Sequence, residues 1–296
     1  MSSYDAVKVE LAMDSLREAL DSESTYAALM LAFNQFKSKA YEIGLMEQSY
    51  GISDQIHVRM HEHRASLNFL ICAYMNLAKM YYEKFYWENY RKKQPTEVSS
   101  MVSNILKNDS KNIDVKEFQS KIKEENPELE LGLKLRNFMQ HNVLLSDTIS
   151  TSFNNDSENI FFNTNTSIPH ERVLGKSNID AKLLDNFANP IDVNILIDKI
   201  TECISTLHLQ VRTLTENKVN QEHVYLINLN HAISTEVNLI NKKYEKGMSK
   251  ATLITEDSQQ EIQYYIGWFS PYKHSKEKYR FFLPHSRIEY SKTKQI

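Results

Sequence analysis

Three residues in the segment 134–145, KLRNFMQHNVLL, have side chains suited to phosphodiester cleavage: Arg136, Asn137 and His141. A histidine exchanges protons near neutral pH, because its unperturbed pKa is about 6.5. An arginine remains charged, and its planar fork of donors suits the negative charge that develops on a phosphorane. An amide one turn before the histidine can orient the ring or bind a phosphate oxygen. These residue types suit RNA cleavage without a metal, with His141 activating the ribose 2′-OH.

The spacing of arginine and histidine does not by itself identify this site. Arg280 and His285 repeat the five-residue interval near the end of the chain, but Pro284 lies between them in a strand-like aromatic segment. The segment that contains Arg136 and His141 has helical spacing and no glycine or proline inside the motif. The predicted helix therefore distinguishes the first pair from the second.

The helical wheel divides the segment into two faces. At about 100° per residue, one face is apolar and is expected to pack against the core; it carries Leu131, Leu135, Phe138 and Leu145. The opposite face carries Arg136, Asn137, Gln140, His141, Leu133 and Leu144. A polar cluster edged with leucine is expected where two subunits meet around a site. The alternative is a partly exposed helix with ordinary surface contacts.

The stretch Leu135–His141, LRNFMQH, resembles the Arg-Asn-x-x-x-His form of the motif that marks HEPN domains. Arg136, Asn137 and His141 match its three positions. The segment His63–Tyr74, HRASLNFLICAY, loosely resembles an earlier helix in a group of uncharacterised bacterial proteins of similar length. The resemblance implies an α-helical bundle, usually dimeric, in which two motifs meet across the subunit contact. Many members are metal-independent ribonucleases of toxin or phage-defence systems, while others only bind nucleotides or have lost activity.

The resemblance therefore implies a metal-independent endoribonuclease with Arg136, Asn137 and His141 as catalytic residues. Because Arg136 and His141 are about 140° apart on the helix, we expect a composite site formed by two copies of the chain. The expected partners are RNA, a second copy and an antitoxin or other regulatory protein, with no cofactor and no metal. Two alternatives remain: a nucleotide- or RNA-binding regulatory module on a HEPN-like fold, and a helical scaffold protein.

Several basic segments could hold RNA. Ser270–Arg280 mixes basic residues with tyrosines, a composition compatible with phosphate contacts and base stacking. The candidate RNA-binding residues are Gln140, Arg91, Lys92, Lys93, Lys273, Lys276, Lys278 and Arg280. The alternative for each basic cluster is a solvated surface.

Three further clusters have structural explanations. His57 and His61 are one helical turn apart, but the HExxH spacing of a zinc site is absent and we predict no metal site. The acidic run EENPELELG around Pro127 is explained by the dipole at a helix start. The aromatic residues between Tyr74 and Tyr90 could stack bases, yet their density favours a core or a subunit contact.

Composition restricts the class of protein. The chain has 296 residues, 41% hydrophobic and 25% charged, with a net charge of −3. These values indicate a globular protein without a general basic surface, so RNA binding would need a local patch. The N-terminus lacks the apolar block of a signal peptide, and we expect a cytoplasmic protein that does not enter the membrane. Cys72 and Cys203 are expected to be reduced.

The chain contains six glycines and six prolines, which favours long helices. We predict a mainly α, HEPN-like helical bundle with small β-hairpin or strand elements near 147–168 and 252–284. Helices are predicted at residues 9–20, 24–47 (capped by Ser24), 53–93, 127–147 and 190–247, with shorter ones in 96–125. The predicted domains are a bundle at 1–146, a connector at 147–176 and a helical region with short strands at 177–296, which could pack with the first.

Overall fold

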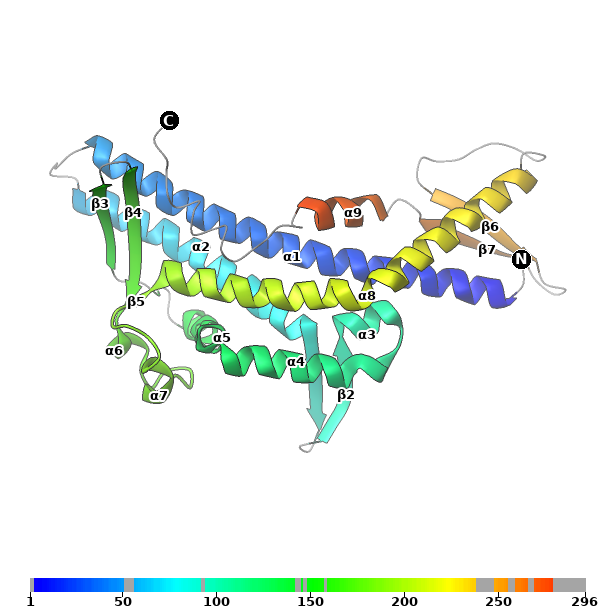
Figure 1. Cartoon of the computed structure of the whole chain (residues 1–296), viewed down its shortest axis with the longest axis horizontal. Helices are drawn as coiled ribbons and strands as arrows, with labels where there is room; N and C mark the ends of the chain where they lie inside the picture. Colours follow the sequence, from blue (N-terminus) through cyan, green and yellow to red (C-terminus); the bar gives the residue numbers. More distant parts are fainter. Residues whose placement is uncertain are drawn as a thin grey trace. The chain divides into compact units, whose positions relative to one another are not determined.

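The computed structural model describes residues 3–50, 56–91, 94–141, 145, 148–156, 159–237, 248–254, 259–265 and 269–278 (Figure 1). Helices predominate in this part of the chain, and the strands form small antiparallel sheets. The predicted mainly helical class with small β elements is confirmed. None of the helices in the described ranges is long and apolar enough to cross a lipid bilayer.

The elements follow one another along the chain. The helices are α1 (Ser3–Tyr50), α2 (Ile56–Phe85), α3 (Met101–Leu106), the 3-10 helix η1 (Asp109–Lys111), α4 (Asn112–Glu125), α5 (Pro127–His141), α6 (His170–Val173), α7 (Ala181–Leu184), α8 (Val193–Val237) and α9 (Phe269–Lys278). The strands are β1 (Tyr86–Arg91), β2 (Gln94–Ser100), β3 (Thr148–Asp156), β4 (Asn159–Ile168), β5 (Ile191–Asp192), β6 (Met248–Ile254) and β7 (Gln259–Tyr265). The sheets are β1-β2, β3-β4-β5 and β6-β7, all with antiparallel pairing.

The chain forms two compact units, each assembled from segments that are distant in sequence. Unit 1 comprises Met1–Ala27, Lys84–Phe118 and His208–Arg280, and unit 2 comprises Ala28–Glu83, Gln119–Leu207 and Phe281–Ile296. The helices α1 and α8 contribute to both units. The predicted domains at 1–146, 147–176 and 177–296 follow the order of the sequence, whereas these units interleave N- and C-terminal segments.

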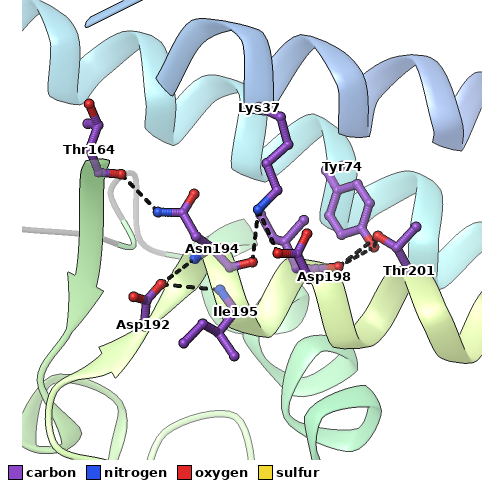
Figure 2. Close-up of polar contacts among 9 residues, drawn as sticks. Lys37, Tyr74, Thr164, Asp192, Asn194, Ile195, Asp198 and Thr201 are labelled. Atoms are coloured by element: carbon purple, nitrogen blue, oxygen red, sulfur yellow. Dashed lines mark hydrogen bonds and ion pairs between the residues drawn. The ribbon is translucent and has the colours of Figure 1, made fainter. Parts of the chain in front are cut away.

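Polar contacts connect three long helices inside unit 2 (Figure 2). Lys37 of α1 donates to the Asn194 carbonyl and forms an ion pair with Asp198 of α8, at 3.3 and 2.8 Å. Tyr74 of α2 is buried, and its hydroxyl lies 2.7 Å from the Thr201 hydroxyl of α8. These contacts satisfy polar groups between packed helices, so their role is structural.

The start of α8 is fixed by the residue before it. The Asp192 carboxylate accepts hydrogen bonds from the backbone N–H groups of Asn194 and Ile195, at 2.8 and 3.2 Å. This is an N-cap, and the negative charge also complements the helix dipole. The Asn194 amide donates to the Thr164 carbonyl of β4 at 2.9 Å, which connects the helix start to the sheet (Figure 2).

The N-terminal helix differs from the prediction. Two helices were expected at 9–20 and 24–47 with Ser24 as a cap, but α1 is continuous from Ser3 to Tyr50. No glycine or proline interrupts it before Gly44. Thr25 is accommodated because its hydroxyl donates to the Asp21 carbonyl one turn earlier, at 2.8 Å.

The aromatic segment after α2 also corrects the prediction. A helix was expected to Lys93, but α2 ends at Phe85 and the chain continues as the β1-β2 hairpin, followed by α3 and α4 within the predicted helical region 96–125. Aromatic residues at alternating positions favour a strand, and Tyr86 and Tyr90 both donate to the Glu88 carboxylate between them. Hence only some of the aromatic residues between Tyr74 and Tyr90 belong to the core.

The C-terminal region contains both expected and unexpected elements. Strands β3 and β4 agree with the predicted hairpin at 147–168, and β6 and β7 agree with strands in the tail. Within 252–284, however, residues 269–278 form the helix α9. Lys273 and Glu277 lie at helical spacing and 4.0 Å apart, an exposed ion pair that is compatible with this helix.

Gly132 allows α5 to approach α8 closely. A Cβ atom at this position would lie 2.3 Å from Cδ1 and 3.1 Å from Cγ1 of Ile200, and 3.7 Å from the Met75 sulfur. Gly132 and Ile200 are both buried. Because Gly132 has no side chain, α5 can pack this close to α8 in unit 2.

We expect Gly132→Ala to reduce the free energy of unfolding. Overpacking costs about 1–3 kcal/mol, which exceeds the gain of about 1 kcal/mol from alanine in a helix. Ile200→Val removes the Cδ1 atom of the clash and should restore part of the loss in the double variant. Urea unfolding of the four proteins measures this coupling; additive effects would show that Ile200 does not limit the approach of α5.

Candidate functional site

Helix α5 has the two faces that its sequence predicts. It begins at Pro127, and Glu128 and Glu130 lie in its first turn, where acidic side chains complement the helix dipole. Leu131, Leu135 and Phe138 are at most 1% exposed. The predicted core face is thus confirmed, and the rotation of α5 is determined by burial of these residues.

The polar face of α5 meets helix α2 through a hydrogen-bonded cluster. The Arg136 Nε atom donates to the Asn76 side-chain oxygen at 2.9 Å. The Asn137 side-chain oxygen accepts from Lys79 Nζ at 2.7 Å and from Arg136 Nη1 at 3.5 Å. We call Asn76, Lys79, Arg136 and Asn137 the α2–α5 polar cluster; it combines two cations with two amides.

This cluster is accessible from solvent. Arg136, Asn137 and Lys79 are half-buried, and Asn76 and Gln140 are exposed. Lys79 also has Glu83 at 3.6 Å, an exposed carboxylate at helical spacing. Two cations beside amide groups form a suitable surface for a phosphate group.

His141 is the last residue of α5, and its side chain lies outside the described part of the structure. Leu144, which was predicted to share its face, is likewise outside the described residues. The role of His141 consequently stays a prediction. The structure brings Arg136 and Asn137 together and adds Asn76 and Lys79, which the sequence analysis missed because both lie on another helix.

An apolar strip flanks the polar cluster on α2. Phe69 is 72% and Met80 is 41% exposed, and both lie at helical spacing from the exposed Asn76. Large apolar side chains on the face that carries a polar site are a feature of subunit contacts. The subunit contact predicted from the wheel of α5 stays a prediction.

The predicted RNA-binding residues outside α5 belong to unit 1. Lys276 of α9 pairs with Glu216 of α8 at 2.7 Å, Lys273 lies 4.0 Å from Glu277, and Lys278 is exposed. Arg91 is the last residue of β1, with its side chain outside the described part. Lys92, Lys93 and Arg280 also lie outside the described residues. Arg136 and Gln140 belong to unit 2.

The histidine side chains near the start of α2 form contacts with neighbouring charged residues. His63 Nε2 and Arg59 Nε lie 3.0 and 3.2 Å from the same Glu47 carboxylate oxygen, and Arg64 Nη2 lies 3.0 Å from His61 Nδ1. The His57 side chain is outside the described part. Within the described ranges, no group of three or more histidine, cysteine or acidic side chains is arranged to hold a metal ion.

A buried charged network lies in unit 1. Arg212 of α8 donates two hydrogen bonds to the Glu23 carboxylate of α1, at 2.8 and 2.7 Å, and His208 Nε2 lies 3.2 Å from the same group. Tyr26 stacks on His208 with ring centroids 4.0 Å apart. The paired charges and the 2% exposure of Glu23 indicate a structural connection between the two helices.

The network perturbs two pKa values in the same direction. Burial by itself would raise the pKa of Glu23, but the hydrogen bonds from Arg212 and His208 lower it to about 2. Burial lowers the pKa of His208, against the opposing effect of Glu23. Arg212 thus supplies the charge that balances Glu23, and His208 is neutral at neutral pH.

Comparisons with protein-family models, with curated proteins and with solved structures give no match for this chain. The resemblance to HEPN domains therefore rests on the residues between Leu135 and His141.

The network predicts that the free energy of unfolding decreases as the pH falls. His208 has a lowered pKa in the folded state, so its contribution is present above about pH 6.5 and is lost below it. The contribution of Glu23 is lost between about pH 4.5 and pH 2. Urea unfolding between pH 8 and pH 3 measures the upper step and the onset of the lower one, and His208→Gln should remove the upper step. Parallel pH profiles for the two proteins would contradict this assignment.

Proposed function

We propose that this protein is a metal-independent endoribonuclease of HEPN type, an effector of a toxin or phage-defence system that acts in the cytoplasm. The α2–α5 polar cluster is the observation that carries the proposal. Arg136 belongs to a motif with residue types suited to RNA cleavage, and its guanidinium lies at a half-exposed position beside Lys79. This position supports contact with a phosphodiester from solvent.

The proposed reaction assigns one role to each motif residue. His141 removes the proton from a ribose 2′-OH, and the oxygen attacks the adjacent phosphorus. The guanidinium of Arg136 stabilises the negative charge of the phosphorane. The leaving 5′-oxygen takes a proton from water and His141 returns its proton to solvent, so the products are a 2′,3′-cyclic phosphate and a 5′-OH. Asn137 would position these groups.

A composite site in a homodimer follows from the positions of the residues on α5. Positions 136 and 141 are about 140° apart around a regular helix, which separates them on one chain. A second copy can supply the complementary position. The exposed Phe69 and Met80 next to Asn76 support a subunit contact at this face, because they leave water only when another surface covers them.

Further side chains are candidates for contacts with RNA. Gln140 is exposed one turn beyond Arg136, and the basic residues Arg91, Lys92, Lys93, Lys273, Lys276, Lys278 and Arg280 remain candidates for contacts with the backbone. An antitoxin or other regulatory protein is the expected partner that restrains the activity.

One observation favours a second function, a non-catalytic nucleotide- or RNA-binding module. The Asn137 oxygen already accepts from Lys79 at 2.7 Å, so this atom is engaged within the chain. In this reading the α2–α5 polar cluster binds a phosphate group without cleavage, and Asn137 holds Lys79 and Arg136 in place.

Cleavage of single-stranded RNA in the presence of EDTA tests the ribonuclease proposal. His141→Ala should reduce the rate by about 10²–10⁴-fold, the usual effect of losing a general acid–base group. The wild-type products should carry 2′,3′-cyclic phosphate and 5′-OH ends. His61→Ala, which removes an exposed imidazole from α2, is the matched control and should leave the rate unchanged.

Circular dichroism should show that the His141 variant is folded. RNA binding by the wild type without any cleavage would support the binding module. Cleavage that requires Mg²⁺ and leaves 5′-phosphate ends would contradict the proposed mechanism.

A further inference from the structure

Helix α2 carries a line of accessible side chains along one face. From residue 58 to residue 83, the side chains that follow one another at alternating intervals of four and three residues are all exposed or half-buried. We call them the α2 heptad face: Val58, Glu62, Ala65, Phe69, Cys72, Asn76, Lys79 and Glu83. All of them belong to unit 2. This spacing is the one with which a helix packs along another helix in a coiled coil.

The middle of the α2 heptad face is apolar and accessible. Phe69 is 72% exposed, and Ala65 and Cys72 lie on either side of it along the face. Val58 at the first position is also exposed, and the exposed Met80 borders the last turn. Burial of these side chains against another surface would remove apolar area from water. The face therefore has the composition of a helix–helix contact.

The two charges that flank the apolar middle indicate what that surface is. An antiparallel alignment of the face with a second copy can place Glu62 of each copy opposite Lys79 of the other, and the same alignment places Phe69 opposite Cys72. A parallel alignment would instead place Glu62 opposite Glu62 and Lys79 opposite Lys79, and like charges repel. The α2 heptad face is thus complementary to itself in the antiparallel direction.

We propose that two copies of this chain associate through the α2 heptad face, antiparallel about a two-fold axis that passes between the positions of Phe69 and Cys72. A two-fold contact uses the same patch on both copies, so each of these pairs occurs twice. The ion pair with Glu62 would engage Lys79 and leave Arg136 as the cation of the α2–α5 polar cluster that receives a phosphate group. That this contact completes a catalytic site rests on the proposed function.

The contact would bring the motif helices of the two copies together. Arg136 bonds to Asn76 at 2.9 Å, and the Leu145 backbone N–H bonds to the Asn68 side-chain oxygen at 2.9 Å, so α5 runs antiparallel to α2. Position 141 lies between these two levels along α2. In the proposed alignment, Asn76 of the second copy lies beyond Asn68. His141 would therefore lie, along the α2 axis, between Arg136 of its own chain and Arg136 of the second copy.

Light scattering coupled to size-exclusion chromatography tests the contact over a range of protein concentrations. The wild type should be a dimer, and Phe69→Glu should weaken its association about a hundredfold, because it places two charges in the apolar middle. Leu209→Glu adds the same charge at a leucine of α8 that is 62% exposed, and this matched control should remain dimeric. A wild-type monomer, or a dimer that Phe69→Glu leaves unchanged, would overturn the proposal.

A charge exchange tests the antiparallel direction. Glu62→Lys and Lys79→Glu should each weaken association about tenfold, because each homodimer then contains two pairs of like charge. A mixture of the two variants should associate as tightly as the wild type, because lysine faces glutamate at both positions of the mixed dimer. Unchanged association in both variants, or a mixture that associates no more tightly than either, would overturn this alignment. Circular dichroism should show that all variants are folded.

Cys72 allows the centre of the contact to be located. The chain contains two cysteines, of which Cys72 is half-buried and Cys203 is 5% exposed. A short bismaleimide reagent should link two wild-type copies through Cys72, and Cys72→Ser should abolish the covalent dimer. A wild-type dimer that the reagent does not link would place the contact elsewhere and overturn the proposal.

The outcomes separate this proposal from the ribonuclease proposal. A dimer that depends on Phe69 and Glu62, in a protein that does not cleave RNA, would support the contact and contradict catalysis. Cleavage that depends on His141 in a monomeric protein would support catalysis and overturn the contact. A monomer whose binding to single-stranded RNA is weakened by Phe69→Glu would make RNA the occupant of this face and overturn the second copy.

Discussion

The close packing of α5 against α2 and α8 in unit 2 determines which residues of the motif helix reach solvent. Leu131, Leu135 and Phe138 are buried. The side chain of Ile200 on α8 occupies the space that a Cβ atom at Gly132 would need. Rotating the helix by one residue would expose a leucine and bury a charge, which is unfavourable on both counts. The orientation of Arg136 and Asn137 toward α2 follows from this apolar contact.

Charged groups serve two different purposes in this protein. In unit 1, Glu23 and Arg212 form a buried pair with two hydrogen bonds, so the charges balance each other within the fold. In unit 2, Arg136 and Lys79 both donate to the Asn137 side-chain oxygen, so two cations lie on the same side of α5. Pairs of like charge lower the stability of an isolated chain and favour an anionic ligand. The charges of the unit 1 network therefore neutralise each other, whereas the cations Arg136 and Lys79 of unit 2 remain suited to binding a phosphate group.

The sequence predicts the parts of the fold that depend on local patterns. The helical spacing of Leu131, Leu135 and Phe138 predicted a buried face, and burial confirms it. The continuity of α1 through Ser24 and the strand β1 after Phe85 were not predicted. The Thr25 hydroxyl bonds to a carbonyl of its own helix, and the backbone of β1 pairs with that of β2, so a hydrogen-bond partner accounts for the local structure in both cases.

The candidate site was predicted only in part for a similar reason. Arg136 and Asn137 share a motif on one helix, so their types and spacing were visible in the sequence. Asn76 and Lys79 come from α2, and only tertiary packing brings them to α5. Pairings of this kind have no periodicity along the chain and are not accessible to pattern analysis.

In the proposed composite site, Arg136 of one copy and His141 of another act on the same phosphodiester. Mixing inactive Arg136→Ala and His141→Ala proteins under conditions that allow subunit exchange tests it directly. Half of the dimers would then be mixed, and each would contain one intact site of two, so RNA cleavage should return to about a quarter of the wild-type rate. A mixture that remains inactive, while mixed dimers are shown to form, would contradict a site shared between two copies.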